Sequence, residues 1–223
     1  ASGFAALVVA ACAAAGIAAS PRDLSILARR GSASAARSIF GGFVELREGE
    51  SEDGSDSFAE ELLDRHAWPL RVVVAITDPG EKAVSSTLGM QSTSASSPFY
   101  PAWVAAAPKA LDRMREAVLA RDFATVGELT EHSCLALHSL MFTTSPALIY
   151  WNAATVAAIH AVRALRADGV PVYFTIDAGP QVKAVCLPGD ADTVAAALSS
   201  VTGVREVIQS GLGPAAAVLD GEA

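Results

Sequence analysis

The segment at residues 172–187, VYFTIDAGPQVKAVCL, decides the fold that we predict. Its two outer parts, residues 172–176 and 182–187, are apolar and rich in β-branched side chains, which favours β-strands. Between them lies DAGP at residues 177–180, and Asp, Gly and Pro are residues that turns prefer. The segment therefore predicts two strands on either side of a turn.

The residues after this segment extend the pattern. Asp190 precedes an alanine-rich stretch that predicts a helix as far as Ser200. Apolar residues at 204–209 predict a strand, and those at 215–219 predict a last short one. The order β-turn-β-α-β-(β) indicates a split α/β unit with an antiparallel component.

The rest of the chain alternates between helical and strand patterns. Helices are expected at residues 4–18, 21–30, 101–121, 122–140 and 147–167. Strands are expected at residues 38–46, where two glycines interrupt the pattern, and at residues 71–77, RVVVAIT, which form the clearest strand of the chain. No repeat of 20–50 residues is visible. The fold class that follows is mixed α/β.

The net charge of −8 is concentrated in one segment. Residues 45–64 contain nine acidic residues and one basic residue, while the acids and bases of the remaining chain are equal in number. For most of these charges we expect a solvated surface loop. The chain has no basic stripe that could neutralise a phosphate backbone, so its composition argues against nucleic-acid binding.

Cysteines and histidines give no sign of a metal or disulfide framework. The three cysteines, Cys12, Cys134 and Cys186, are scattered and form no CxxC pair, and the four histidines form no HExxH motif. This pattern predicts no metal site and no disulfides, and it fits a reducing compartment, so we expect a cytoplasmic protein.

The uncharged segment at residues 3–19 invites a membrane interpretation. It is dominated by alanine, is slightly short for a membrane span of about 20 strongly apolar residues, and has no basic residues before it. We therefore expect a buried helix, in which small side chains let neighbouring backbones approach. Because the chain starts abruptly at Ala1 without a Met, we also expect that further sequence precedes it.

A first candidate binding segment is RGSASAAR at residues 30–37. Its small residues would let a ligand approach the backbone, its hydroxyls and N–H groups could donate to phosphate oxygens, and Arg37 adds a planar, charged fork. The alternative is a flexible turn between a helix and a strand, which composition alone favours.

A second candidate is KAVSSTLGM at residues 82–90, which follows a strand and precedes the start of a helix. The unpaired N–H groups and positive dipole end of a helix attract anions. The alternative is an ordinary Ser or Thr cap, which stabilises a helix by about 1 kcal/mol.

A third candidate is Asp177, which ends an apolar strand beside two small residues, Ala178 and Gly179. A carboxylate in that position would be partly desolvated, and it must then be paired or used. The alternative is a turn-initiating Asp that binds its own backbone. The strand before it favours a functional role.

Taken together, these segments resemble the mevalonate diphosphate decarboxylases of the GHMP kinase superfamily. The matching motifs are SGFAALVVAA (2–11), GSASAARSIFGGFVE (31–45), EDGSDS (52–57), KAVSSTLGMQ (82–91), ARDFATV (120–126) and TIDAGPQVK (175–183). A further stretch, SGLGP at residues 210–214, lies where the family has a glycine-rich turn. The six motifs occur in the family's order, and the resemblance extends over nearly the whole chain.

The resemblance implies a fold and a reaction. The fold is a GHMP kinase-like two-domain sandwich, with residues 1–90 as an N-terminally incomplete first domain and residues 91–223 as a split α/β, ferredoxin-like second domain. The reaction is the ATP-dependent decarboxylation of mevalonate 5-diphosphate to isopentenyl diphosphate, with ATP and Mg²⁺ as cofactors. The tertiary hydroxyl is phosphorylated first, and phosphate then leaves as CO₂ is lost. The family is commonly dimeric, which implies a homodimer.

The resemblance also implies roles for individual residues. Asp177 would lie against the tertiary hydroxyl and orient it or accept its proton, and Arg37 would hold the substrate carboxylate. The substrate's carboxylate or diphosphate would be bound by Ser32, Ser34, Ser85, Ser86 and Lys82. Ser2 and Gly3 resemble the end of the family's nucleotide-phosphate loop. The acidic EDGSDS stretch becomes a structural feature of the family.

Several alternatives stay open. The family often has Asn where this chain has Gln181, so we assign Gln181 no role. Relatives act on mevalonate 5-phosphate or stop after phosphorylation, and the sequence does not separate these substrates. A non-catalytic, truncated homologue is a different class of function. A membrane-anchored protein rests on residues 3–19 alone and is disfavoured.

Overall fold

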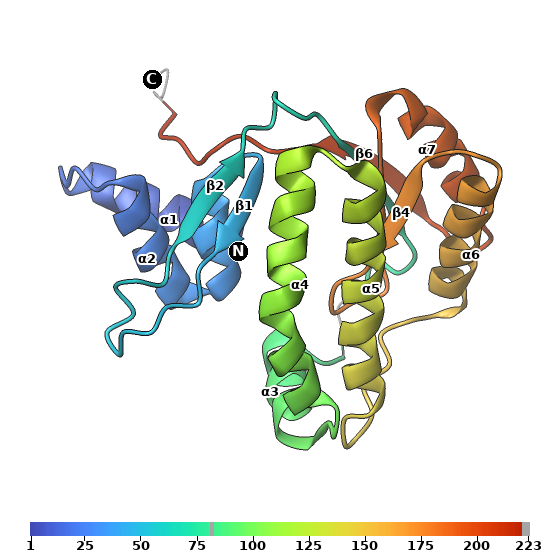
Figure 1. Ribbon diagram of the computed structural model, residues 1–223, viewed down its shortest axis with the longest axis horizontal. Helices are drawn as coiled ribbons and strands as arrows, with labels where there is room; N and C mark the ends of the chain where they lie inside the picture. Colours follow the sequence, from blue (N-terminus) through green and yellow to red (C-terminus); the bar gives the residue numbers. More distant parts are fainter. Residues whose placement is uncertain (81–82, 220–223) are drawn as a thin grey trace. The chain divides into compact units, whose positions relative to one another are not determined.

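The computed structural model describes residues 1–80 and 83–219, and its chain divides into two compact units (Figure 1). The first unit comprises Ala1–Trp68 together with the C-terminal segment from Leu212, and the second comprises Pro69–Gly211. Each unit is described by itself below.

The second unit is built on a four-stranded antiparallel sheet with the strand order β4-β5-β3-β6. Its strands are β3 (Arg71–Ile76), β4 (Val172–Thr175), β5 (Val182–Cys186) and β6 (Glu206–Gly211). Arg71 pairs with Cys186 on one side and with Gly211 on the other, so β3 is an inner strand. The predicted turn at residues 177–180 joins β4 to β5, as the sequence indicates.

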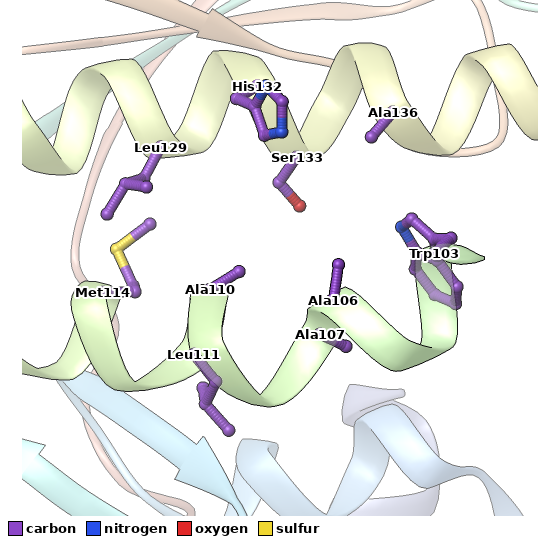
Figure 2. A pocket seen from close by; sticks show the side chains of 10 residues that line it. All are labelled: Trp103, Ala106, Ala107, Ala110, Leu111, Met114, Leu129, His132, Ser133 and Ala136. Atoms are coloured by element: carbon purple, nitrogen blue, oxygen red, sulfur yellow. The ribbon is translucent and has the colours of Figure 1, made fainter. Parts of the chain in front are cut away.

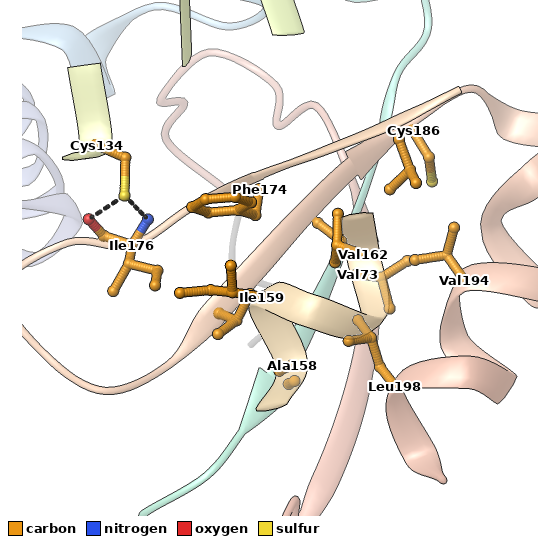
Figure 3. Close-up of a cluster of buried hydrophobic side chains, with 14 of the residues drawn as sticks. Val73, Cys134, Ala158, Ile159, Val162, Phe174, Ile176, Cys186, Val194 and Leu198 are labelled. Atoms are coloured by element: carbon orange, nitrogen blue, oxygen red, sulfur yellow. Dashed lines mark hydrogen bonds between the residues drawn. The ribbon is translucent and has the colours of Figure 1, made fainter. Parts of the chain in front are cut away.

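The core of this unit lies between the sheet and two helices, α6 (Ala153–Ala167) and α7 (Ala191–Ser199). Figure 3 shows Val73 and Phe174 from the sheet meeting Ile159 and Val162 of α6, with Val194 of α7 beside them. All are buried, and each large apolar side chain removed from water contributes about 1.5–3 kcal/mol. A short 3₁₀ turn, η2 (Pro188–Asp190), precedes α7.

Three more helices complete the second unit: α3 (Ser86–Ser96), α4 (Tyr100–Ala120) and α5 (Phe123–Phe142). α4 ends where Arg121 adopts a left-handed conformation (φ 56°), and Asp122 then caps α5 by accepting a hydrogen bond from the Thr125 N–H at 3.1 Å. The two long helices predicted at 101–121 and 122–140 are confirmed with these small shifts of boundary.

α5 lies against β4 through a glycine. A Cβ at Gly127 would come within 2.0 Å of the Tyr173 ring, so only glycine permits this approach. The two elements are also joined by a hydrogen bond from the Phe174 N–H of β4 to Glu131 of α5 at 3.1 Å, and Arg166 of α6 holds Glu131 in an ion pair at 2.6 Å. α5 is therefore fixed to the strand that ends next to Asp177.

The first unit contains α1 (Ser2–Ala14), α2 (Pro21–Gly31), the 3₁₀ helix η1 (Ala33–Ile39) and a two-stranded antiparallel sheet of β1 (Phe43–Leu46) and β2 (Ala59–Leu63). Its core is a cluster of Ala5, Ala28, Ala35 and Ile39. α2 begins with a capping box between Ser20 and Asp23, in agreement with the predicted start at Pro21.

The acidic segment is the solvated loop that we expected for most of its charges, since Glu48, Glu50, Glu52 and Asp53 are exposed between β1 and β2. Residues 59–63 form β2, and the loop before it is tied to α2, because Arg29 donates to the carbonyls of Gly54 and Ser57, both at 3.1 Å. Asp56 accepts from the Glu50 N–H at 2.7 Å. Local hydrogen bonds, which charge counting does not reveal, thus order this segment.

The expectation of a buried N-terminal helix is wrong for most of α1. Ala5 is its buried residue, whereas Phe4 and Leu7 are 46% and 62% exposed, because α1 packs on α2 and η1 along one edge alone. Within residues 1–80 and 83–219, the helices are too short or too polar to cross a bilayer.

Three further element predictions need correction. The helix expected at 147–167 begins at Ala153, because Asn152 and Thr155 form a capping box there. The strand expected at 38–46 starts only at Phe43, since residues 33–39 wind into η1. Residues 215–219 are not a strand, although the Ala216 N–H donates a backbone hydrogen bond to the Ile39 carbonyl at 3.1 Å.

The compact units do not divide after residue 90, where the domain boundary was expected, but after Trp68. The reason is β3, which pairs with both β5 and β6 and so belongs to the C-terminal sheet. A strand's partners are distant in sequence, so its pattern alone does not say which sheet it joins.

Candidate functional site

Asp177 lies at the start of the β4–β5 turn, where its carboxylate pairs with Lys183. The Lys183 Nζ lies 2.8 Å from Asp177 Oδ2, and the β-ladder explains this contact, because Thr175 pairs with Lys183 at the end of β4. The expected partial desolvation is wrong: the Asp177 side chain is 79% exposed, and Ala178 and Gly179 are the buried residues of the turn. Asp177 is paired and open to a ligand.

Polar side chains hold the far end of the same turn. The Pro180 carbonyl accepts hydrogen bonds from the Thr155 hydroxyl at 2.7 Å and from the Thr77 hydroxyl at 3.1 Å. Asn152 donates from Nδ2 to the Thr77 hydroxyl at 3.1 Å. The turn is thus tied to the end of β3 and to the first turn of α6.

Gln181 was given no role from the sequence, yet it joins the turn to the loop after β3. Its Oε1 accepts from the Thr77 N–H at 2.7 Å, and its Nε2 donates to the Asp78 carbonyl. A side-chain amide that pairs with both backbone groups of a strand end continues the sheet by one step. Only a cross-strand contact map, not a motif, could have revealed this role.

The loop after β3 leads to the N-terminus of α3. The Ser85 hydroxyl accepts from the Leu88 N–H at 3.3 Å and so caps the helix, which is the plain alternative given for this motif. Ser85 and Ser86 are both exposed. Lys82 lies outside the described residues.

A cavity of about 380 Å³ lies between this loop and the turn. Its lining includes Val84, next to Ser85, and Pro180, the last residue of the turn. Tyr150 also lines it and donates to the Val84 carbonyl at 3.3 Å, while burial raises the pKa of its hydroxyl. The second candidate segment, through Val84, and the end of the turn that Asp177 begins, through Pro180, therefore border one hollow of the second unit, and Asp177 itself is not among its lining residues.

The first unit holds the remaining candidate residues. Ser32 and Ser34 lie at the junction of α2 and η1 with their hydroxyl oxygens 2.9 Å apart, and Arg37 is exposed on η1. The neighbouring Ala35 and Ala36 are buried and fix η1 to the core. The segment expected to be a loop is thus a 3₁₀ helix that presents two hydroxyls and a guanidinium.

Ser2 and Gly3 form the first turn of α1 and are exposed. The helix has no side-chain cap, since Ala1 precedes it, and a Cβ at Gly3 would meet no atom within 4 Å. Open space and first-turn N–H groups suit an approaching anion. Within the described ranges, no three His, Cys, Asp or Glu side chains gather as a metal site would require.

A second hollow, of about 270 Å³, lies between α4 and α5 (Figure 2). Side chains from both helices face it, and most are apolar: Leu111, Met114 and several alanines, with Trp103 at one end. Only His132 and Ser133 add polar side chains from α5. This groove lacks the converging charged groups that phosphoryl transfer needs, so we do not count it as the site.

Comparisons with known proteins decide the family. The family model of the mevalonate 5-diphosphate decarboxylase C-terminal domain matches residues 72–214, and that of the diphosphomevalonate decarboxylase-like N-terminal domain matches residues 1–59. The chain belongs to the mevalonate 5-diphosphate decarboxylase family. The resemblance seen in its motifs is therefore confirmed.

Curated members of this decarboxylase family align over most of the chain. Diphosphomevalonate decarboxylase mvd1 of Aspergillus fumigatus is 38% identical over 207 residues, which are 91% of this chain and 51% of the relative. The diphosphomevalonate decarboxylase of Homo sapiens is 36% identical over 183 residues, which are 80% of this chain and 45% of the relative. The chain thus spans about half the length of the curated relatives it matches.

Solved structures of the decarboxylase family share the fold. The chain superposes on "MDDEF in complex with MVAPP, AMPPCP and Magnesium" with a TM-score of 0.87 and 38% identity, covering 96% of this chain and 65% of that one. The mevalonate diphosphate decarboxylase of Staphylococcus aureus gives a TM-score of 0.88 at 31% identity, covering 96% and 64%. The predicted mixed α/β, GHMP kinase-like fold is confirmed.

Proposed function

We propose that the protein to which this chain belongs decarboxylates mevalonate 5-diphosphate with ATP, yielding isopentenyl diphosphate, CO₂, ADP and phosphate. The observation that carries the proposal is the open carboxylate of Asp177, which pairs with Lys183 at the start of the turn whose last residue, Pro180, lines the cavity, in a chain of the decarboxylase family. The solved relative in complex with MVAPP, AMPPCP and magnesium supports the choice of substrate and nucleotide.

Asp177 would bind the tertiary hydroxyl of the substrate. A carboxylate within hydrogen-bond reach of a hydroxyl orients its lone pair toward the transferred phosphoryl group and can take its proton. Lys183 restricts the carboxylate to one orientation through the 2.8 Å contact. Its ammonium also offers a positive charge next to the phosphate that forms and leaves.

Arg37 would hold the substrate carboxylate with its planar fork until CO₂ leaves. The hydroxyls of Ser32 and Ser34 lie 2.9 Å apart, so one donates to the other and the second stays available to donate to the same acid or to the diphosphate. Ser85 and Ser86 would bind the diphosphate from the N-terminal end of α3, where helix N–H groups favour anions, and Lys82, which lies outside the described residues, would add its charge.

Ser2 and Gly3 would bind ATP phosphates through the exposed first turn of α1. ATP supplies the phosphoryl group that turns a poor leaving group into a good one. A solved relative's complex contains magnesium, but no three-residue ligand set lies within residues 1–80 and 83–219 of this chain. Mg²⁺ usually keeps several waters and binds through one or two carboxylates and the substrate phosphates, so it would enter with ATP and would not need such a set.

A cytoplasmic location and a homodimer complete the proposal. Cys12, Cys134 and Cys186 are all free thiols, as suits a reducing compartment. Neither the location nor the oligomeric state has a bearing on the chemistry at Asp177.

The direct test is release of CO₂ from carboxyl-labelled mevalonate 5-diphosphate, measured with and without ATP and repeated with mevalonate 5-phosphate. The proposal predicts ATP-dependent release from the diphosphate and stoichiometric formation of ADP and phosphate. CO₂ release from mevalonate 5-phosphate but not from the diphosphate would show that the monophosphate is the substrate. ADP formation without CO₂ release would show that the protein is a kinase and not a decarboxylase.

A further inference from the structure

Two buried polar side chains of α5 contact the residue that precedes Asp177. Cys134 and His138 are four residues apart, so they lie on one face of the helix. The Ile176 N–H donates to Cys134 Sγ at 3.2 Å, and Figure 3 shows both contacts between Cys134 and the backbone of Ile176. His138 Nε2 lies 3.2 Å from the Ile176 carbonyl oxygen.

These side-chain contacts take the place of the hydrogen bonds that a neighbouring strand would make to Ile176. The β4–β5 ladder ends where Thr175 pairs with Lys183, so Ile176 lies beyond it. Ile176 is also buried, and a buried backbone group without a hydrogen bond is costly. The side chains of α5 thus satisfy both backbone groups of Ile176, one residue before the exposed carboxylate.

The protonation states of the two side chains fit this arrangement. His138 Nε2 faces the Ile176 carbonyl and the Trp151 Nε1–H, both at 3.2 Å, while its Nδ1 is buried without a partner among the described residues. If Nε2 carries the proton, it donates to Ile176 and leaves Nδ1 as a bare acceptor, and the N–H of the half-buried Trp151 then loses Nε2 as its acceptor. The other tautomer would bury an unpaired N–H, which proteins rarely do. Burial lowers the pKa of His138 and raises that of Cys134 to about 11, so both are neutral near pH 7.

We propose that Cys134 and His138 are positioning residues that fix the backbone of Ile176 and thereby direct the Asp177 carboxylate toward the substrate. The role rests on the proposed function, since it presumes that Asp177 meets a reacting hydroxyl. The backbone is held from α5 and the carboxylate from Lys183 of β5, so the functional group is oriented at both ends. A misplacement of about 1 Å can cost about 10²-fold in rate.

The test uses matched substitutions in the intact protein. Cys134→Val removes the sulfur contacts at similar volume, and Cys186→Val makes the same change at a buried cysteine of the same core, which lies on β5 and pairs with Val172 rather than Ile176. His138→Met removes the ring donor, and His138→Gln keeps an N–H donor near the position of Nε2. Amide hydrogen exchange at Ile176 and steady-state decarboxylation are measured for all four, together with their global stability.

We expect Cys134→Val to speed exchange at the Ile176 N–H at least tenfold, after correction for global stability, whereas His138→Met releases the Ile176 carbonyl and should speed this exchange less. Both substitutions should lower kcat about tenfold while KM for ATP changes less than twofold. Cys186→Val should leave both quantities near wild type, and His138→Gln should restore most of the rate. Equal exchange and equal kcat in the two cysteine variants would overturn the proposal.

The two readouts separate this inference from the proposed function. If the intact wild-type protein releases no CO₂ from mevalonate 5-diphosphate, the proposed function fails. The exchange comparison at Ile176 then still decides whether α5 holds the backbone before Asp177, because it needs no substrate.

Discussion

Lys183 Nζ lies 2.8 Å from Asp177 Oδ2, and the two residues are brought together by the register of β4 and β5. Lys183 is largely covered, with a 27% exposed side chain, whereas Asp177 is open. The covered ammonium acts as a fixed anchor and the carboxylate as the group that faces a ligand.

Replacing Lys183 by Met should lower kcat about tenfold, because the carboxylate loses its orienting partner and samples several rotamers. The same change at the exposed Lys109 of α4 should leave kcat within twofold of wild type. Steady-state kinetics at saturating ATP measures both. An unchanged kcat in Lys183→Met would show that the ion pair is a surface contact of the usual small value.

Gln181 should control the loop that leads to Ser85. Gln181→Leu removes the acceptor for the Thr77 N–H and the donor to the Asp78 carbonyl, so amide exchange at Thr77 should rise at least tenfold. KM for the phosphorylated substrate should rise several-fold. Gln209→Leu is the matched control, since Gln209 is an exposed amide of β6 that donates to Asp192 at 3.0 Å. Identical exchange at Thr77 in both variants would contradict this role.

The ion pair between Glu131 and Arg166 should stabilise the second unit. The two side chains are 14% and 29% exposed, and Glu131 also accepts from the Phe174 N–H. Glu131→Ala leaves a half-buried guanidinium without its partner, so the free energy of unfolding should fall by about 1–3 kcal/mol. This loss is smaller than the loss caused by breaking a fully buried ion pair. Glu128→Ala, one turn earlier and exposed, should cost less than about 0.5 kcal/mol. Urea unfolding measures the free energy of unfolding of both variants, and equal losses in the two would contradict the stabilising role of the ion pair.

Stability should fall on mild acidification because of His138. Burial lowers the pKa of this ring in the folded state, so below its ordinary value near 6.5 the unfolded chain binds the additional proton. The free energy of unfolding should therefore decrease as the pH falls from 7 through 6.5, by at most about 1.4 kcal/mol per pH unit for one proton, and level off below the folded pKa. His138→Gln should flatten the profile, whereas His160→Gln, at an exposed site of α6, should not. A parallel profile for wild type and His138→Gln would exclude this origin.

Strand and helix patterns predicted most of the second unit, because β-branched runs and capping residues act locally. VYFT and VKAVC became β4 and β5, and the DAGP turn lies between them. The sequence did not show long-range strand pairing: β3 joins the C-terminal sheet, and the compact units divide after Trp68, whereas we expected a domain boundary after residue 90. Partners that a strand selects across more than 100 residues leave no trace in its own composition.

The candidate site was likewise predictable from the sequence only in part. Asp177 was found from its place after an apolar strand, but its exposure depended on which turn residues face the core, and these are Ala178 and Gly179. Gln181, Cys134 and His138 carried no motif that sets them apart, because their roles arise from contacts 38 to 104 residues away. The residues that support a functional group are visible only once the fold is known.

The role of Asp177 is tested most directly by measuring ATP-dependent CO₂ release by the variant Asp177→Asn. The substitution keeps the size of the side chain and removes its charge and proton-accepting capacity, so release should fall about 10²–10⁴-fold while the affinity for nucleotide stays within twofold. Turnover close to that of the wild type would contradict the role of Asp177 and the account built on it.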